Sequence, residues 1–433
     1  MSDAPIALFS VATVLVCGLA FALNIPLLER RFVPALIVAA TWTPALVFQF
    51  FSVKFIDPVY LPLNHGVSPA TGLLMGLGFL SFTLGTVAGF ALVDRLPFKP
   101  PATSVADLVE RASGRLVVLF LVGFLIFIYA FRQSDLSGAL LAQSSNSKDV
   151  YQDRLAFHVG PINHLLFLMD IVSVVFMKRF FEAGKFRHTL PAAVTVLCNL
   201  MTLQKSRVLF LVFSSLFLFF LSGPSARKAV FGTKFRVFLF SAASVFGAAA
   251  LLVANMLRGI GLLRLTNLSS SLIEQLYIYS GAPALLNLSG TVEGWIPSDP
   301  PKDGLILIRS LLWSFVDRDT LYIGRYLNGI NNGTALMYYW ADFRTLGIIL
   351  IPFLVGILVT LGLRLAQGLS VFGLMAGCIA FDALVMSVYT EVTFEPTTLI
   401  ILAVAAMVDV LTRLTWAPRG VASAVVLQPE AAA

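Results

Sequence analysis

The chain has 433 residues, of which 58% are hydrophobic and only 12% are charged, and its mean hydropathy is +0.88. Soluble globular domains carry about 25% charged residues, so this composition excludes an ordinary soluble enzyme. It also excludes intrinsic disorder, which requires low hydrophobicity. A polytopic membrane protein remains. The formal net charge of +7 then indicates loops rich in Lys and Arg rather than a surface for nucleic acid.

Apolar stretches recur along the chain, and a helix that crosses a bilayer needs about 20 mostly apolar residues. The sequence predicts about eleven such spans. They are approximately residues 6–27, 32–52, 70–93, 116–132, 160–178, 189–204, 207–222, 237–257, 346–363, 369–389 and 397–415. The predicted fold is therefore an all-α polytopic membrane protein.

The distribution of Lys and Arg predicts the orientation in the membrane. One set of alternate loops carries 17 of these residues, whereas the opposite short loops carry six. Cytoplasmic loops are enriched in positive charge, so the first set is cytoplasmic, the N-terminus is outside and the C-terminus is inside. The predicted organisation has spans 1–8 in residues 1–257, a large external loop in 258–345, spans 9–11 in 346–418, and a disordered cytoplasmic tail in 419–433.

The large external loop carries seven positive charges, six of them arginine. Arginine offers a planar fork that suits phosphate and stays charged near lipid. Residues 267–277 favour a short helix that begins at an Asn-Leu-Ser cap, and residues 303–316 favour a second one that is too short to span. This second helix is either re-entrant or lies in the membrane interface, with Trp313 as its anchor. The loop is thus expected to contain short helices and to bind an anion.

Four features of the chain together resemble one protein family. A tight external turn bears Arg207, and a span ends at Arg258 to open the large loop. The loop contains YIYSGAPALLNL at 277–288 and closes with TALMYYWADFRTLG at 334–347. This layout resembles the bacterial oligosaccharide repeat-unit polymerases, the O-antigen polymerase or Wzy-type family. The family segment usually reads Asp-Phe-Gly, whereas here Arg344 stands at the glycine position.

The resemblance implies a glycosyltransferase of the GT-C type in the bacterial inner membrane. Such an enzyme transfers a growing glycan from undecaprenyl pyrophosphate onto a new lipid-linked repeat unit at the periplasmic face, in O-antigen, capsule or exopolysaccharide synthesis. The resemblance also implies a chain-length-determining co-polymerase as a partner. The substrate and the lipid bilayer are the other expected partners. No cofactor and no nucleic acid are expected.

A pyrophosphate leaving group gathers negative charge in the transition state, and fixed cations stabilise it best. The candidate pyrophosphate-binding residues are Arg207, Arg258, Arg264, Arg309, Arg318, Arg325 and Lys205. Arg207 stands in the first turn of a predicted helix, where a cation is unfavourable unless an anion binds there. The alternative for Arg207 is an interfacial arginine that contacts lipid headgroups.

The acceptor hydroxyl must lose a proton, so we expect a general base among the external residues. The candidates are His164, Glu274 and Asp342. The alternatives are a capped interfacial histidine for His164 and an N-cap of the following span for Asp342. The Asp-Arg-Asp string at 317–319 could bind a hard cation. The resemblance implies, however, that a metal-using GT-C enzyme carries acids in its first external loop, and here that loop offers only Asp57, so no metal is expected.

Two other functions remain open. A ligase that moves finished glycan from the same carrier lipid would share the arginine-rich loop. A flippase or secondary transporter would use acids inside the membrane, and Asp170 and Asp382 lie within predicted spans. Asp409 stands four residues before Arg413, which favours an ion pair along one helix. Because the positive charges that the orientation rule does not explain lie in the large external loop, and no internal repeat or midplane charge cluster is visible, the sequence favours a transferase over a transporter.

Overall fold

A computed structural model of the protein describes residues 34–55, 67–95, 105–133, 161–202, 205–222, 282–294, 334–367, 370–388, 392–393 and 396–413. Throughout these ranges every regular element is a helix, so the all-α class is confirmed there. The predicted spans at 6–27 and 237–257, the short helices at 267–277 and 303–316, and the tail at 419–433 lie outside the described residues.

The helices follow the predicted apolar stretches closely. They are α2 (Pro34–Phe55), α3 (Pro69–Arg95), α4 (Val105–Gln133), η2 (Pro161–Leu166), α7 (Phe167–Ala183), η3 (Phe186–Thr189), α8 (Leu190–Met201), α9 (Lys205–Leu221), α13 (Ala282–Glu293), α15 (Ala335–Leu365), α16 (Val371–Met386) and α17 (Pro396–Arg413). Each predicted span that falls on described residues overlaps one of these helices.

Three of the described helical segments are long and apolar enough to cross a membrane: Pro69–Arg95, Ala112–Gln133 and Ala335–Leu365. Shorter apolar segments occur in α2, α9, α16 and α17. The described part of the chain is therefore all-helical and contains apolar helices long enough to cross a membrane. The count of eleven spans and the orientation stay predictions.

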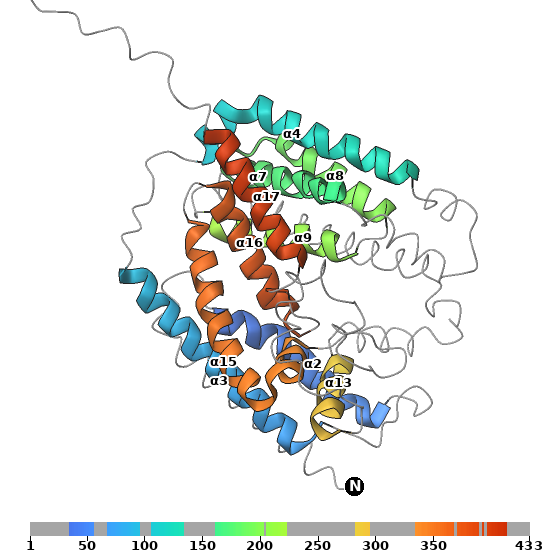
Figure 1. The fold of residues 1–433 in the computed structure, drawn as a ribbon, viewed down its shortest axis with the longest axis vertical. Coiled ribbons are helices and arrows are strands. Elements are labelled where there is room, and N and C mark those ends of the chain that lie inside the picture. The colour runs from blue at the N-terminus through green and yellow to red at the C-terminus, as the bar shows by residue number, and fades with distance from the viewer. Residues whose placement is uncertain are drawn as a thin grey trace, which may run out of the picture.

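The helices form two groups around α16 (Figure 1). One group contains α4, α7, α8 and α9, and the other contains α2, α3, α13 and α15. Helix α16 contacts members of both groups, and its residues from Cys378 to Leu384 are all buried. A helix that is apolar and buried on every side belongs in the core of a helix bundle.

Helices α3 and α15 cross very closely because glycines line their contact. A Cβ atom added to Gly85 would lie 2.1 Å from the carbonyl oxygen of Phe353, and one added to Gly356 would lie 2.5 Å from that of Phe82. Small residues let membrane helices approach in this way. The Ser81 hydroxyl also donates to the Ile349 carbonyl, next to the turn that Pro352 disturbs.

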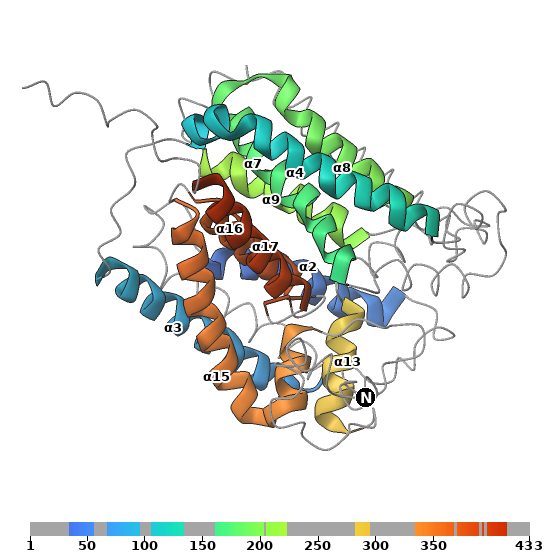
Figure 2. The same cartoon turned by 45° about the horizontal axis from the view of Figure 1, so that its top comes forward.

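Helix α15 has two arms that meet at Arg344. Thr334 caps the helix, its Oγ1 accepting a hydrogen bond from Met337 N at 3.2 Å. Arg344 has φ 52° and ψ −135°, so the helix breaks between a short arm, 335–343, and a long arm, 345–365. The short arm turns back at this corner (Figure 2). The sequence prediction began the span at 346 and offered Asp342 as its cap, whereas Thr334 caps α15.

The described parts of the predicted external loop pack against the spans. Helix α13 contacts α2, α3 and α15, and Ser289 Oγ accepts a hydrogen bond from Ser68 N at 3.1 Å. Ala335 N donates to Ser387 O at 2.9 Å, and Trp42 Nε1 donates to Ser387 Oγ at 2.8 Å. Helix α13 was missed by the sequence prediction, although Pro283 beside its first residue is a helix-start signal.

Candidate functional site

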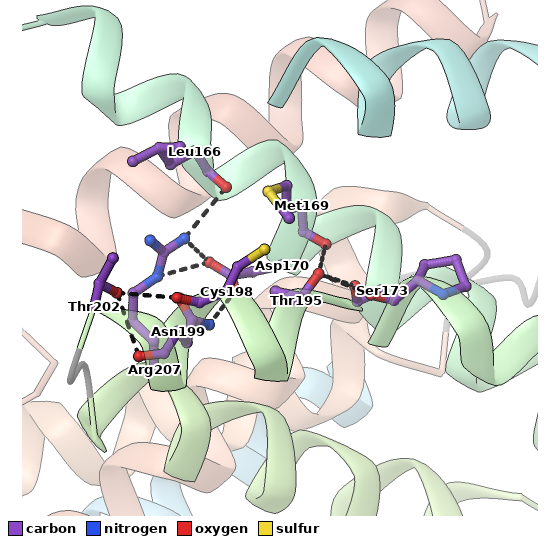
Figure 3. Close-up of polar contacts among 10 residues, drawn as sticks. Leu166, Met169, Asp170, Ser173, Thr195, Cys198, Asn199, Thr202 and Arg207 are labelled. Atoms are coloured by element: carbon purple, nitrogen blue, oxygen red, sulfur yellow. Dashed lines mark hydrogen bonds and ion pairs between the residues drawn. The ribbon is translucent and has the colours of Figure 1, made fainter. Parts of the chain in front are cut away.

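A buried polar centre in the described interior is built on an ion pair between α7 and α9 (Figure 3). Arg207 donates from Nε to Asp170 Oδ2 at 3.0 Å and from Nη2 to the same oxygen. Its Nη2 also donates to the Leu166 carbonyl at 3.2 Å. Two nitrogens of one guanidinium are therefore fixed by α7 and by the residue that precedes it.

Two further side chains complete this centre. Asn199 of α8 donates from Nδ2 to Asp170 Oδ1 at 3.5 Å, so both carboxylate oxygens accept a hydrogen bond. The guanidinium carbon of Arg207 lies 4.7 Å from the centroid of the Phe167 ring, a cation–π distance. The side chain of Asp170 is 1% exposed and that of Arg207 is 15% exposed, so an edge of the arginine faces outward.

The local sequence explains how three helices bring these residues together. Gly184 ends α7 in the left-handed conformation, with φ 69°, and lets the chain reverse into η3 and α8. A hydrogen bond of 2.9 Å between the hydroxyls of Ser173 and Thr195 fixes the register of α7 against α8. The short connection after α8 then places Arg207 in the first turn of α9, beside Asp170.

The ion pair explains two unfavourable features of the sequence, one at Arg207 and one at Asp170. A cation in the first turn of α9 needed an anion, and the Asp170 carboxylate is such an anion. An acid within an apolar span needed a reason, and Arg207 balances its charge. The sequence flagged both residues but did not pair them, although charges within a membrane usually find each other.

The other predicted site residues are spread more widely. His164 lies in η2, the turn that ends at Leu166, and is partly exposed. Lys205 is the first residue of α9. Asp342 lies on the short arm of α15, in the other helix group, and is fully buried. The remaining candidates lie outside the described residues; they are Glu274, Arg258, Arg264, Arg309, Arg318 and Arg325.

The two other flagged acids are also placed by the structure. Asp382 is buried on α16. Asp409 of α17 accepts a hydrogen bond from Val371 N at 3.1 Å, so it caps the start of α16 in addition to the Ser370 side chain. The predicted pair of Asp409 with Arg413 stays a prediction, because the side chain of Arg413 lies outside the described ones. Within the described ranges, no three His, Cys, Asp or Glu residues are grouped as a metal site would need.

Comparison of the chain with known family models, curated proteins and solved structures finds no match to any of them.

Proposed function

We propose that this protein is an oligosaccharide repeat-unit polymerase of the bacterial inner membrane. It transfers an undecaprenyl-pyrophosphate-linked glycan onto the next lipid-linked repeat unit at the periplasmic face. The layout of the chain, the arginine-rich large external loop and the membrane-length helices support this proposal. A chain-length-determining co-polymerase is the protein partner that goes with it, and no cofactor is needed.

The observation that carries the proposal is the fixed position of Arg207. Asp170 and the Leu166 carbonyl hold the guanidinium at the start of α9, where backbone N–H groups favour an anion. A cation held in place before the reaction stabilises a developing pyrophosphate charge without the cost of reorganisation. The partly exposed edge of Arg207 is where a phosphate oxygen would approach.

Because Asp170 and Arg207 together carry no net charge, Arg207 alone cannot balance the negative charge of a pyrophosphate. A pyrophosphate therefore needs further cations. The candidates are Arg258, Arg264, Arg309, Arg318, Arg325 and Lys205. In this arrangement Arg207 orients the pyrophosphate, and the other cations balance its negative charge.

Among the three candidate bases, His164 fits the described geometry best. It stands two residues before Leu166, whose carbonyl contacts Arg207, so it belongs to the same end of α7. Asp342 is buried on the other helix group and needs the short arm of α15 to open before it can reach a hydroxyl. Glu274 remains a third candidate.

The test is deletion of the gene in its host, followed by complementation. Surface polysaccharide is run on a gel beside a lipid-linked oligosaccharide extract. We expect deletion to stop the glycan at a single repeat unit, and Arg207→Lys to restore less polymer than wild type at equal protein level, because lysine cannot bridge Asp170 and a phosphate as a fork does. Chain growth that is unchanged by deletion contradicts the proposal.

The same experiment separates the alternatives. Long polymer that stays on the carrier lipid indicates a ligase, and repeat units trapped on the cytoplasmic face indicate a flippase. The transporter hypothesis depended in part on Asp170 as an acid inside the membrane. Arg207 balances the charge of Asp170 without a transported ion. We therefore retain the transferase as the principal proposal.

A further inference from the structure

The turn between α7 and α8 exposes three consecutive residues, two cations and the aromatic ring between them. Lys185, Phe186 and Arg187 are all exposed, and the exposed fraction of Phe186 is 60%. The side chains of Lys185 and Arg187 have no ion-pair or hydrogen-bond partner among the residues that the structure describes. An apolar side chain between two cations is typical of a surface that lies in the membrane interface.

The local structure fixes this turn with its middle facing outward. Gly184 ends α7 in the left-handed conformation, with φ 69°. His188 faces inward, since it is 8% exposed and its ring stacks on that of Phe176 with 5.9 Å between the centroids. Thr189 Oγ1 donates a hydrogen bond to the Phe186 carbonyl at 2.8 Å. The two cations are thus presented on a defined turn.

Helix α4 marks the edges of the apolar layer of the membrane. Arg115 and Arg132 are both exposed, and every exposed side chain between them is apolar or aromatic. The two arginines are 17 residues apart, which is about 26 Å along a helix and close to the roughly 30 Å of a bilayer's hydrocarbon. Arg115 therefore stands at one edge of this layer and Arg132 at the other.

Helix α7 runs antiparallel to α4. Gly123 of α4 packs against Met169 of α7. Phe127, later on α4, belongs to the same hydrophobic cluster as Leu166, which precedes α7. The end of α7 therefore lies at the same membrane edge as Arg115.

The turn after α7 lies beyond this edge, at the depth of lipid headgroups. Arg115 precedes Gly123 by eight residues, and eight residues along α7 from Met169 lead to Met177. Gly184 follows seven residues later, about 10 Å further along the helix. Phospholipid headgroups occupy about the first 5–8 Å outside the hydrocarbon, and helix tilt shortens the distance of the turn from it. The two cations of the turn are therefore level with the phosphate groups of the membrane.

We propose that Lys185, Phe186 and Arg187 form a binding site for the headgroup of an anionic phospholipid such as phosphatidylglycerol. The two cations attract the phosphate, and the phenylalanine ring enters the boundary with the acyl chains. The exposed ring favours a lipid over a soluble anion, which has no apolar part to contact it. The site does not depend on the proposed polymerase activity, and Arg207 contacts the opposite end of α7.

A tryptophan placed at the turn reports which lipid is in contact with it. Full-length Phe186→Trp and wild type are reconstituted in vesicles of phosphatidylcholine and phosphatidylglycerol, with one of the two lipids brominated in its acyl chains. Bromine quenches nearby tryptophan, so the fluorescence that Phe186→Trp adds over wild type gives the ratio of the two lipids at the turn.

Three variants are made on the Phe186→Trp background. Lys185→Gln with Arg187→Gln removes both charges of the turn, and Lys185→Arg with Arg187→Lys keeps them. Arg115→Gln is the matched control, because it removes an exposed cation from α4 at the same membrane edge. All the changed side chains are exposed, so each variant is expected to fold.

We expect Phe186→Trp to prefer phosphatidylglycerol at the turn, and the preference to fall about fivefold for each cation of the turn that is removed. The charge-conserving exchange and Arg115→Gln should leave the preference nearly unchanged. The proposal is overturned if neither lipid quenches, if both quench equally, or if the preference survives the loss of both cations.

Two further outcomes also overturn the proposal. A preference that Arg115→Gln lowers as much as the double glutamine variant reflects the general field of the membrane edge and not a site at the turn. A preference that inorganic phosphate abolishes at constant ionic strength assigns the turn to a soluble anion instead of a lipid.

Discussion

The two helix groups each contain one unusual arginine, and the structure treats the two differently. Arg207 breaks a local rule as a cation at the start of α9, and Asp170, Leu166 and Asn199 compensate for it within the α7–α9 group. Arg344 breaks a local rule as a non-glycine residue at positive φ. Its contact with Trp340 does not relieve that backbone strain.

The difference separates an arginine whose charge is balanced by its neighbours from one whose backbone stays strained. A violated local rule that is compensated by neighbours is explained by the fold, whereas one that is not compensated points to function. By this criterion the position of Arg207 is explained by Asp170. The backbone conformation of Arg344 is the local feature that the contact with Trp340 leaves unexplained. Four substitutions test the comparison.

The largest effect is expected at the compensated pair. Asp170→Ala leaves a mostly buried guanidinium without its carboxylate, and such breaks cost about 3–5 kcal/mol. The double variant Asp170→Leu with Arg207→Met removes both charges and should recover most of that loss. Thermal unfolding in detergent micelles measures both. A double variant as unstable as the single one would show that the ion pair itself is needed for folding.

The close crossing of α3 and α15 is expected to be the next most sensitive feature. Gly85→Ala places a Cβ atom 2.1 Å from the Phe353 carbonyl oxygen, so the long arm must move away, at a cost of about 1–3 kcal/mol. Gly114→Ala is the control, because a Cβ atom there meets nothing within 4 Å. It should stabilise α4 by up to about 1 kcal/mol. Equal unfolding temperatures for the two variants contradict the tight crossing.

A third substitution tests whether carboxylates secure helix starts in this protein more generally. Asp409 caps α16 from α17, as Asp170 neutralises the start of α9 from α7. Asp409→Ala should cost about 1 kcal/mol, and Asp409→Asn should cost less because an amide oxygen still accepts from Val371 N. Unfolding in detergent micelles compares the two. An alanine variant as stable as wild type would limit the principle to α9.

The smallest expected effect is at the strained corner. Arg344→Gly removes about 1–3 kcal/mol of backbone strain, loses a cation–π contact and adds flexibility to the unfolded chain, so a net stabilisation of about 0.5 kcal/mol remains. Gly294→Ala is the converse control, since Gly294 has φ 78° and open space around it. It should destabilise by about 1 kcal/mol. Marked destabilisation by Arg344→Gly would mean that the arginine side chain supports the fold.

Much of the helical layout followed from residue type and spacing. Apolar stretches predicted α2, α3, α8, α9, α16 and α17 within a few residues, because a lipid-length run of apolar side chains admits few structures other than a helix. They also predicted α4 and α7, but α4 begins 11 residues before the predicted span and α7 begins seven residues after it. The predicted span at 346–363 coincides with the long arm of α15, whereas the short arm and α13 were missed. Both contain buried polar residues, such as Asn287 and Asp342, that pattern analysis assigns to a loop.

The sequence by itself determined the class of the protein and named the residues that break local rules. Composition alone predicted a helical membrane protein. The burial of a chain in lipid depends on how many apolar residues it carries and not on how these residues contact one another. Tertiary structure alone decided which polar residues pair with one another. Asp170 and Arg207 are 37 residues apart and meet only because α8 is inserted between their helices with a fixed register. The conformation of Arg344 likewise follows from how two arms of one helix pack, which no local pattern records.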